Sequence, residues 1–330
     1  MRLLMLGGTG FVGRAVVEEA VARGWDVTVL HRGTKATPEG ATVLHGDRLA
    51  PGGLAALAEG EWDLVVDTWS ARPSAVRDSA NLLAGRVGRY VYISSCSVYA
   101  EPVVHAAAEA GQVVEATADL GDEADYAAAK RGGELATLAA FGEEHSLLVR
   151  CGLILGPGED IGRLPWWLTR IAAGGPVLAP GPADLPLQYV DVRDLAVWTL
   201  DAAAAGLSGP YNLASRTGHA TMSELLDAAK AVTGSDAELR WTDPETIAAA
   251  GIKPWTELPI WASPGEYHDF LYSTVVEKAV AAGLACRPVG ETVADTWAWL
   301  RSIGGVAPQR PDRPAVGLDR AREEKLLSES

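Results

Sequence analysis

The stretch Arg2-Leu3-Leu4-Met5-Leu6-Gly7-Gly8-Thr9-Gly10-Phe11-Val12-Gly13 joins an apolar run to a cluster of glycines. The apolar run predicts a strand over Arg2–Leu6, and the residues after the cluster predict a helix over Phe11–Arg23. A glycine turn between a strand and a helix suits a pyrophosphate, because the helix start offers backbone N–H groups and the positive end of its dipole. The turn therefore predicts a dinucleotide site that uses Gly7, Thr9, Gly10, Phe11, Val12 and Gly13.

The rest of the first half keeps this alternation of short apolar runs and helical stretches. Strands are predicted at Asp26–Leu30, Ala41–Leu44, Leu64–Asp67, Tyr90–Ser94 and Leu147–Cys151, and helices at Gly52–Glu59, Pro73–Ala84 and Tyr126–Glu144. Strands that alternate with helices indicate βαβ units and a parallel sheet. The predicted fold class is α/β, with a doubly wound (Rossmann) dinucleotide-binding core over residues 1–155.

Residues 156–330 have a different pattern, dense in proline and glycine, with helices predicted at Thr221–Val232, Thr274–Ala282 and Glu291–Leu300. We expect a smaller, mostly helical substrate-binding region there, with segments around residues 187–215 returning to the core. The proline-rich and charged tail from Pro308, with one short helical piece, is expected at the periphery.

Composition restricts the function classes. The 330 residues carry 43 acids and 28 bases, a net charge of −15. A phosphate backbone and an anionic membrane surface would both be repelled, so we expect neither nucleic acid nor a membrane as a partner. The three cysteines, Cys96, Cys151 and Cys286, lack metal-ligand spacing. They indicate a reducing, cytoplasmic location and no metal site.

The residues after the second predicted strand indicate whether the dinucleotide is NAD or NADP. They read His31-Arg32-Gly33, without the acid that usually holds the ribose hydroxyls of NAD. Arg32 could bind a 2′-phosphate through two hydrogen bonds, which favours NADP, with NAD as the alternative. Further predicted cofactor contacts follow the strand ends: His31, Asp47, Arg48, Thr68 and Trp69.

A second group of residues, Ser95, Tyr126 and Lys130, has side chains suited to catalysis. Ser95 follows the fifth predicted strand, and Tyr126 has Lys130 four residues later on a predicted helix. This spacing places the phenol and the amine on one helix face, one turn apart. A neighbouring ammonium favours the ionised form of a tyrosine, which suits a general acid/base.

Together with the glycine turn, these residues resemble the extended (atypical) short-chain dehydrogenase/reductase superfamily, in its NAD-dependent epimerase/dehydratase-like branch. Further matches are Arg150, Gly156-Pro157-Gly158 and the run Tyr189-Val190-Asp191-Val192-Arg193-Asp194. The resemblance implies Tyr126 as general acid/base, Lys130 on the nicotinamide ribose and Ser95 on the substrate oxygen. It also implies a small-molecule substrate and a homodimer.

The sequence departs from that family where substrate is bound. Cys96 and Ser97 stand where family dehydratases carry Asp-Glu, and Leu153 and Leu187 replace polar residues of members that bind sugar nucleotides. The substrate is therefore expected to be small and weakly polar or aromatic. The candidate substrate contacts, for which core packing is the alternative, are Cys96, Leu153, Trp166, Trp167, Leu187, Trp255, Trp261 and His268.

Three functions remain open from the sequence. The first is an NAD(P)-dependent oxidoreductase that transfers hydride to or from a carbonyl or alcohol. The second is an epimerase or isomerase that oxidises and re-reduces its substrate with tightly bound NAD(P). The third, a non-catalytic dinucleotide-binding regulator, is disfavoured by the intact Ser95, Tyr126 and Lys130.

Overall fold

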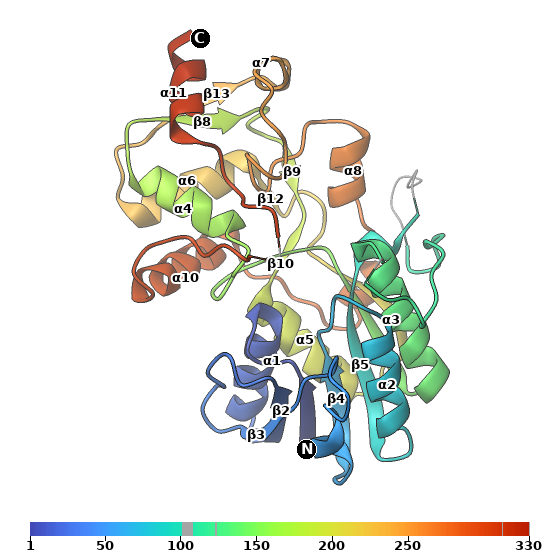
Figure 1. The fold of residues 1–330 in the computed structure, drawn as a ribbon. Coiled ribbons are helices and arrows are strands. Elements are labelled where there is room, and N and C mark those ends of the chain that lie inside the picture. Colours follow the sequence, from blue (N-terminus) through green and yellow to red (C-terminus); the bar gives the residue numbers. More distant parts are fainter. Residues whose placement is uncertain (101–107, 123, 312, 330) are drawn as a thin grey trace. The chain divides into compact units, whose positions relative to one another are not determined.

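The computed structural model describes residues 1–100, 108–122, 124–311 and 313–329 (Figure 1). The described chain forms two compact units. Unit 1 comprises Met1–Gly152, Val192–Ala214 and Thr274–Ala285, and unit 2 comprises Leu153–Asp191, Ser215–Ser273 and Cys286–Ser330. Unit 1 thus takes back two segments from the second half of the chain, and each unit is described by itself below.

The described residues of unit 1 build a seven-stranded parallel sheet in the order β11-β6-β5-β4-β1-β2-β3. Its strands are β1 (Arg2–Leu6), β2 (Asp26–His31), β3 (Thr42–His45), β4 (Trp62–Asp67), β5 (Val87–Ser95), β6 (Ser146–Cys151) and β11 (Gly209–Leu213). Six of these strands coincide with or closely match the sequence prediction, and in all of them except the edge strand β3 the apolar run is buried. The sheet confirms the predicted α/β class.

Helices of unit 1 pack in pairs, α1 (Phe11–Ala22) with α5 (Val192–Ala204) and α2 (Ser74–Leu83) with α3 (Tyr126–Phe141). The step from β1 to β2 and the step from β4 to β5 run in opposite directions across the sheet. Right-handed crossovers therefore place α1 and α2 on opposite faces. The direction reverses between β1 and β4, the position where sheets of this kind bind ligands at their carboxyl ends.

Some helices of unit 1 differ from the prediction. The stretch Gly52–Glu59 forms a single 3-10 turn, η1 (Ala55–Leu57), and Thr274–Ala282 is reduced to α9 (Glu277–Ala281). Helix α3 ends at Phe141, where Gly142 adopts a positive φ of 69°, a backbone that favours glycine. Strand β11 and helix α5 were not predicted, although the buried positions Val192, Leu195, Ala196 and Ala203 of α5 follow a helical period.

Unit 2 contains short paired strands that the sequence analysis did not predict. The pairs are β7 (Leu153–Leu155) with β10 (Tyr189–Asp191), β8 (Pro176–Pro180) with β13 (Glu238–Thr242), and β9 (Pro186–Leu187) with β12 (Ala220–Thr221). Its helices are α4 (Arg163–Ala172), α6 (Met222–Thr233), α7 (Pro244–Ala249), α8 (Glu266–Tyr272), α10 (Val289–Ser302) and α11 (Arg320–Glu329). The strands of two or three residues, β7, β9, β10 and β12, carry too little alternation to be recognised.

The C-terminal tail belongs to the core of unit 2, which corrects the expectation that it is peripheral. Leu326 of α11 joins the hydrophobic core, and the buried Glu323 accepts a hydrogen bond of 2.6 Å from Nε of Arg170. The other oxygen of Glu323 accepts from the backbone N–H of Leu178 at 2.9 Å. These contacts join α11 to α4 and β8.

Candidate active site

The glycine turn has the geometry that a pyrophosphate needs. Gly7 and Gly8 have φ of 120° and 78°, a backbone that favours glycine. A Cβ on Gly13 would lie 2.6 Å from the backbone nitrogen of Gly8, so this glycine allows α1 to pack on the turn. A Cβ on Gly10 would meet no described atom within 4 Å. Gly10 is the N-cap of α1, and none of the described side chains caps this helix, so its first N–H groups fit a phosphate ligand.

The ends of β2 and β3 lie side by side, with His31 opposite His45 in the register. The two imidazole rings meet edge to face at 5.4 Å, and burial together with the neighbouring His45 lowers the pKa of His31. Nδ1 of His31 accepts the backbone N–H of Gly33 at 3.0 Å, which shapes the turn that follows. Arg32 in this turn is exposed, so its guanidinium faces solvent. Asp47 accepts the backbone N–H of Leu49 at 3.0 Å.

Arg48, a predicted cofactor contact, is engaged inside the protein. Its guanidinium is buried and donates to both oxygens of Asp67 at 2.7 Å, to Oγ of Ser79 at 3.0 Å and to the carbonyl of Ala75 at 2.9 Å. Burial by itself raises the pKa of Asp67, but the Arg48 charge and these hydrogen bonds outweigh it and hold that pKa below its usual range. Arg48 therefore fixes the end of β4 from inside the protein.

The loop after β4 is held in place by Asp67. Oδ1 of Asp67 accepts the backbone N–H of Trp69 at 2.9 Å, and the Tyr90 hydroxyl donates to Oδ2 at 2.6 Å. The Trp69 indole donates to the carbonyl of Arg72 at 2.9 Å and lies 5.0 Å from the Arg48 guanidinium carbon. Thr68 lies beside the glycine turn, because its Oγ1 would be 2.6 Å from a Cβ on Gly7.

Lys130 reaches two backbone carbonyls at this end of the sheet. Its ammonium donates to the Trp69 carbonyl at 2.8 Å and to the Ile93 carbonyl at 2.6 Å, and lies 5.0 Å from the ring centroid of Tyr92. The Lys130 side chain is 3% exposed, so these carbonyls replace its water shell. The charge of Lys130 is thereby fixed between the ends of β4 and β5.

Tyr126 is the first residue of α3. Asp125 caps the helix by accepting the backbone N–H of Ala128 at 2.8 Å, which sets its start. Gly133 lets α3 approach the sheet, since a Cβ there would lie 2.4 Å from the Tyr92 hydroxyl. Tyr126 is 39% exposed, so its phenol is accessible on the helix face that also carries Lys130.

Ser95 ends β5 and is the N-cap of the turn η2 (Cys96–Val98). Its Oγ accepts the backbone N–H of Ser97 at 3.1 Å and donates to Oγ of Ser97 at 3.1 Å. The carbonyl that holds Lys130 belongs to Ile93, two residues before Ser95, and α3 packs against both β5 and η2. The elements therefore bring Ser95 and the first turns of α3 to one edge of the sheet.

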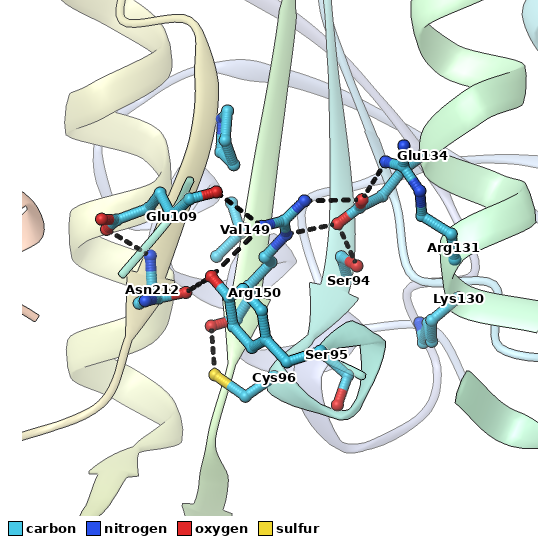
Figure 2. A network of polar contacts seen from close by, with 12 residues as sticks. Ser94, Ser95, Cys96, Glu109, Lys130, Arg131, Glu134, Val149, Arg150 and Asn212 are labelled. Carbon is cyan, nitrogen blue, oxygen red and sulfur yellow. Dashed lines mark hydrogen bonds and ion pairs between the residues drawn. The ribbon is translucent and has the colours of Figure 1, made fainter. Parts of the chain in front are cut away.

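A buried network beneath these residues escaped the sequence analysis. Glu134, one turn after Lys130, accepts from Nε and Nη2 of Arg150 at 2.8 and 3.0 Å and from Ser94 at 2.8 Å (Figure 2). Arg150 also donates to the Tyr99 hydroxyl at 3.1 Å, which in turn donates to Asn212 at 2.5 Å. The network ties α3 to β5, β6 and β11. The i, i+3 spacing of Arg131 and Glu134, whose side chains pair at 2.8 Å, is a local signal that points to Glu134.

Cys96 also lies in this network, to which its protonated thiol contributes a hydrogen bond. Its Sγ donates to the Arg150 carbonyl at 3.2 Å (Figure 2). Burial raises the pKa of Cys96 to about 12, so the group stays protonated at neutral pH. A protonated thiol that is engaged with the backbone makes no nucleophile.

The candidate substrate contacts of unit 2 separate into two groups. Trp167, Trp261 and Leu187 are fully buried in the core, and each indole N–H donates to a backbone carbonyl, of Pro259 at 2.6 Å and of Gly181 at 3.0 Å respectively. A fully buried side chain offers a ligand no surface, which favours core packing, the alternative left open by the sequence, for these three residues. Leu153, at 7% exposed, belongs to the same core.

The other three are Trp166, Trp255 and His268. His268 is buried, with Nε2 2.9 Å from the Pro186 carbonyl and its ring 5.1 Å from that of Tyr272, and so packs against β9. Trp166 is partly buried beneath Gly317 of the tail. Trp255 is partly buried, and the Arg163 guanidinium carbon lies 4.9 Å from its ring centroid.

Comparison with known proteins identifies the family. Residues 3–214 match the NAD dependent epimerase/dehydratase family, a range that includes the glycine turn, Ser95, Tyr126 and Lys130. This chain belongs to that family. The epimerase/dehydratase family is a branch of the extended short-chain dehydrogenase/reductases, so the resemblance inferred from the sequence is confirmed. As a member, the chain is a nicotinamide-dinucleotide-dependent enzyme.

Two relatives of this epimerase/dehydratase family member are reductases by name. The 3-diazoavenalumate denitrifying reductase of a Streptomyces species is 28% identical over 62% of this chain and 74% of its own length. The 2'-dehydrokanamycin reductase of Streptomyces kanamyceticus is 33% identical over 66% of this chain and 62% of its own length. The UDP-glucose 4-epimerase of Thermus thermophilus, solved with NAD, has the same fold, with a TM-score of 0.62 and 22% identity over 91% of this chain and 99% of its own.

The structure bears on the remaining sequence predictions in two further ways. Across the described ranges, no helix is long and apolar enough to cross a membrane. Nor do three or more His, Cys, Asp or Glu side chains gather as a metal site would require, within the part of the chain that the structure describes.

Proposed function

We propose that this enzyme transfers hydride between a nicotinamide dinucleotide and a carbonyl or alcohol of a small molecule, with Tyr126 as the general acid/base. The observation that carries the proposal is the position of Lys130. Its ammonium is held by the carbonyls of Trp69 and Ile93 at the carboxyl end of the sheet, one helical turn from Tyr126. A fixed positive charge there favours the phenolate form of Tyr126 during proton transfer.

The dinucleotide would be held by the glycine turn and the first N–H groups of α1, where Gly10 leaves room for a phosphate. When bound, it supplies the hydride. Arg32, exposed in the turn after β2, would bind a 2′-phosphate, so we propose NADP as the preferred form. The ribose on the nicotinamide side would lie by Lys130.

The protein groups then act on the substrate oxygen. Ser95 turns its hydroxyl proton from Oγ of Ser97 to that oxygen and polarises it, while the Ser95 oxygen goes on accepting the backbone N–H of Ser97. Tyr126 donates its proton as an alkoxide forms, or accepts one in the reverse direction. The 39% exposure of Tyr126 leaves its phenol accessible for this step.

Reduction is favoured over sugar-nucleotide chemistry by two features. Both curated relatives are named as reductases. In addition, Leu187 is fully buried in apolar surroundings, so this position supplies no cation for a diphosphate. An epimerase cycle remains the alternative for the same groups, because the family includes epimerases by name.

The test is Tyr126→Phe, assayed by NADPH and NADH oxidation with a panel of small ketones, aldehydes and quinones. We expect turnover to fall by about 10²–10⁴-fold while the cofactor dissociation constant stays within twofold, because only the transferable proton is lost. Full turnover in Tyr126→Phe would refute the role of the phenol. Cofactor that copurifies with the protein and is not consumed would favour the epimerase cycle.

A further inference from the structure

The carbonyl of Trp69 accepts hydrogen bonds from two side chains at the carboxyl end of the sheet in unit 1. The ammonium of Lys130 donates to it at 2.8 Å, and the hydroxyl of Tyr92 donates to it at 2.9 Å. A backbone carbonyl has two lone pairs, so it can accept both donors at once. The position of Lys130 is therefore coupled to that of Tyr92, a residue of β5 that takes no part in the proposed reaction.

The backbone of Trp69 is also held from its other side. Its N–H donates to Asp67 at 2.9 Å, and its indole N–H donates to the carbonyl of Arg72 at 2.9 Å. The Arg48 guanidinium carbon lies 5.0 Å from the centroid of the indole ring. These contacts fix the loop after β4, and the hydroxyl of Tyr92 is the contact through which β5 sets the direction of the Trp69 carbonyl.

The ring of Tyr92 contacts Lys130 as well. Nζ of Lys130 lies 5.0 Å from the ring centroid, within the range over which an aromatic face attracts a cation. Tyr92 is fully buried, and Gly133, which has no Cβ, lets α3 approach its hydroxyl. Because the ring and the ammonium are both buried, water screens the attraction between them only weakly.

Two phenols with different environments lie near this ammonium. Tyr126 is 39% exposed, whereas burial holds the pKa of the fully buried Tyr92 well above its usual range. Negative charge on Asp67, on ionised Tyr126 and on Glu134 acts on Tyr92 in the same direction. Tyr92 therefore stays neutral and remains a hydrogen-bond donor while Tyr126 changes its protonation state.

The other titratable groups near these phenols keep their charge state through neutral and alkaline pH. Asp67 pairs with Arg48 at 2.7 Å, and Glu134 pairs with Arg150 at 2.8 Å. Burial alone would raise the pKa of each carboxyl, but the guanidinium charges and hydrogen bonds outweigh it and hold both pKa values below their usual range. Burial raises the pKa of the Cys151 thiol of β6 well above its ordinary value.

We propose that Tyr92 is a positioning residue of the reaction, which holds Lys130 through the Trp69 carbonyl and through its own ring so that the ammonium charge acts on Tyr126. This inference rests on the proposed function, because it concerns the charge that tunes the general acid/base. Without the Tyr92 hydroxyl the carbonyl loses one of its two donors, and without the ring the ammonium loses an attractive face. Either loss weakens the hold on the charge, so Tyr126 then ionises at a higher pH.

The test follows the ionisation of Tyr126 in the full-length protein, without cofactor and without substrate. The near-ultraviolet absorbance of tyrosinate is recorded from pH 6 to pH 11, and the titration of a matched protein that also carries Tyr126→Phe is subtracted. The variants are Tyr92→Phe, which removes the hydroxyl and keeps the ring, and Tyr92→Leu, which removes both. Lys130→Met, in which the charge is absent, gives the limiting shift.

Tyr272→Phe is the matched control. Tyr272 is also fully buried, and its hydroxyl also donates to a backbone carbonyl, that of Ile260 in unit 2. This variant therefore reports what the loss of a buried phenol-to-carbonyl hydrogen bond does to the protein in general.

We expect Tyr92→Phe to raise the pH of half-ionisation of Tyr126 by about 0.5 pH unit and Tyr92→Leu by about 1 pH unit. Lys130→Met should raise it at least as far, and Tyr272→Phe should leave it unchanged. Circular dichroism at each pH identifies the folded proteins, and Tyr92→Phe decides alone if Tyr92→Leu does not fold. Unchanged ionisation in the folded Tyr92 variants overturns the proposal, and so does an equal shift in Tyr272→Phe.

A kinetic measurement separates positioning from a merely structural role. For a carbonyl compound that the wild type reduces, Tyr92→Phe should lower kcat roughly threefold to tenfold and leave KM within twofold. The alkaline limb of kcat/KM should move to higher pH by the same shift as the absorbance titration. A lower kcat with an unmoved pH profile would contradict positioning.

Failure of this inference is distinguishable from failure of the proposed function. Full turnover in Tyr126→Phe refutes the proposed function, whatever the Tyr92 variants show. A shift in Lys130→Met without a shift in the Tyr92 variants refutes only the positioning role. No shift in Lys130→Met refutes the action of the ammonium on Tyr126, and the positioning role with it.

Discussion

Replacing Arg48 by methionine distinguishes a structural role from a cofactor role at the end of β4. The change leaves Asp67, which is 0% exposed, without the two hydrogen bonds of 2.7 Å that its oxygens receive from Arg48. Breaking a buried ion pair by removing one partner destabilises a protein by about 3–5 kcal/mol. Tyr90 and the Trp69 N–H still donate to Asp67, so we expect the lower end, about 3 kcal/mol.

The loss should depend on pH with a definite sign. In the wild type the pKa of Asp67 is below its usual range, since the Arg48 charge outweighs burial. Its contribution is therefore present above the unfolded pKa of about 4 and is lost as pH falls. In Arg48→Met burial dominates and raises the pKa of Asp67, so the variant loses stability as pH rises. The difference in unfolding free energy between wild type and variant should grow from pH 4 to pH 8.

Urea denaturation at pH 5, 6.5 and 8 measures this difference. Arg48→Met/Asp67→Asn is the matched double variant, and its pH dependence at this site should disappear because no charge remains. Arg32→Met, which removes an exposed guanidinium of the same unit, should change the unfolding free energy by less than about 0.5 kcal/mol. A pH-independent loss below 1 kcal/mol in Arg48→Met, with weaker NADPH binding instead, would refute the structural assignment.

Three further predictions concern the cofactor site and unit 2. Gly10→Ala should leave stability unchanged and weaken NADPH binding at least tenfold in a fluorescence titration. Gly13→Ala should instead lower the unfolding free energy by about 1–3 kcal/mol, because its Cβ would lie 2.6 Å from the Gly8 nitrogen. Equal changes in binding and in stability for the two variants would contradict this prediction. Arg32→Ala should weaken NADPH binding about tenfold or more and NADH binding by less than twofold. Equal losses of affinity for the two cofactors would show that Arg32 does not bind the 2′-phosphate. Because burial raises the pKa of Glu159 from 4.5 to about 7, its contribution to stability is present below pH 4.5 and is lost as pH rises through 7, by roughly 3 kcal/mol. Glu159→Gln should flatten this decline in urea denaturation between pH 5 and 8.5, and an unchanged decline would place the titration elsewhere.

The sequence by itself determined the features that local chemistry encodes. The glycine turn, the first six strands of the sheet and the Tyr126–Lys130 spacing are contiguous or one helical turn apart, so their pattern is legible without a fold. The predicted start of α3 at Tyr126 is likewise local, because Asp125 caps it, whereas the predicted end at Glu144 runs past Gly142, after which the helix does not continue.

Only the tertiary structure decided which polar and aromatic residues are used internally. Arg48 and Asp67 are 19 residues apart and Arg170 and Glu323 are 153 apart, so no local pattern announces either pair. The same holds for the tryptophans. The sequence does not distinguish a buried indole, as in Trp167, from one stacked on a cation, as in Trp255. The physical reason is that burial and pairing depend on contacts between distant segments, which exist only once the chain has folded.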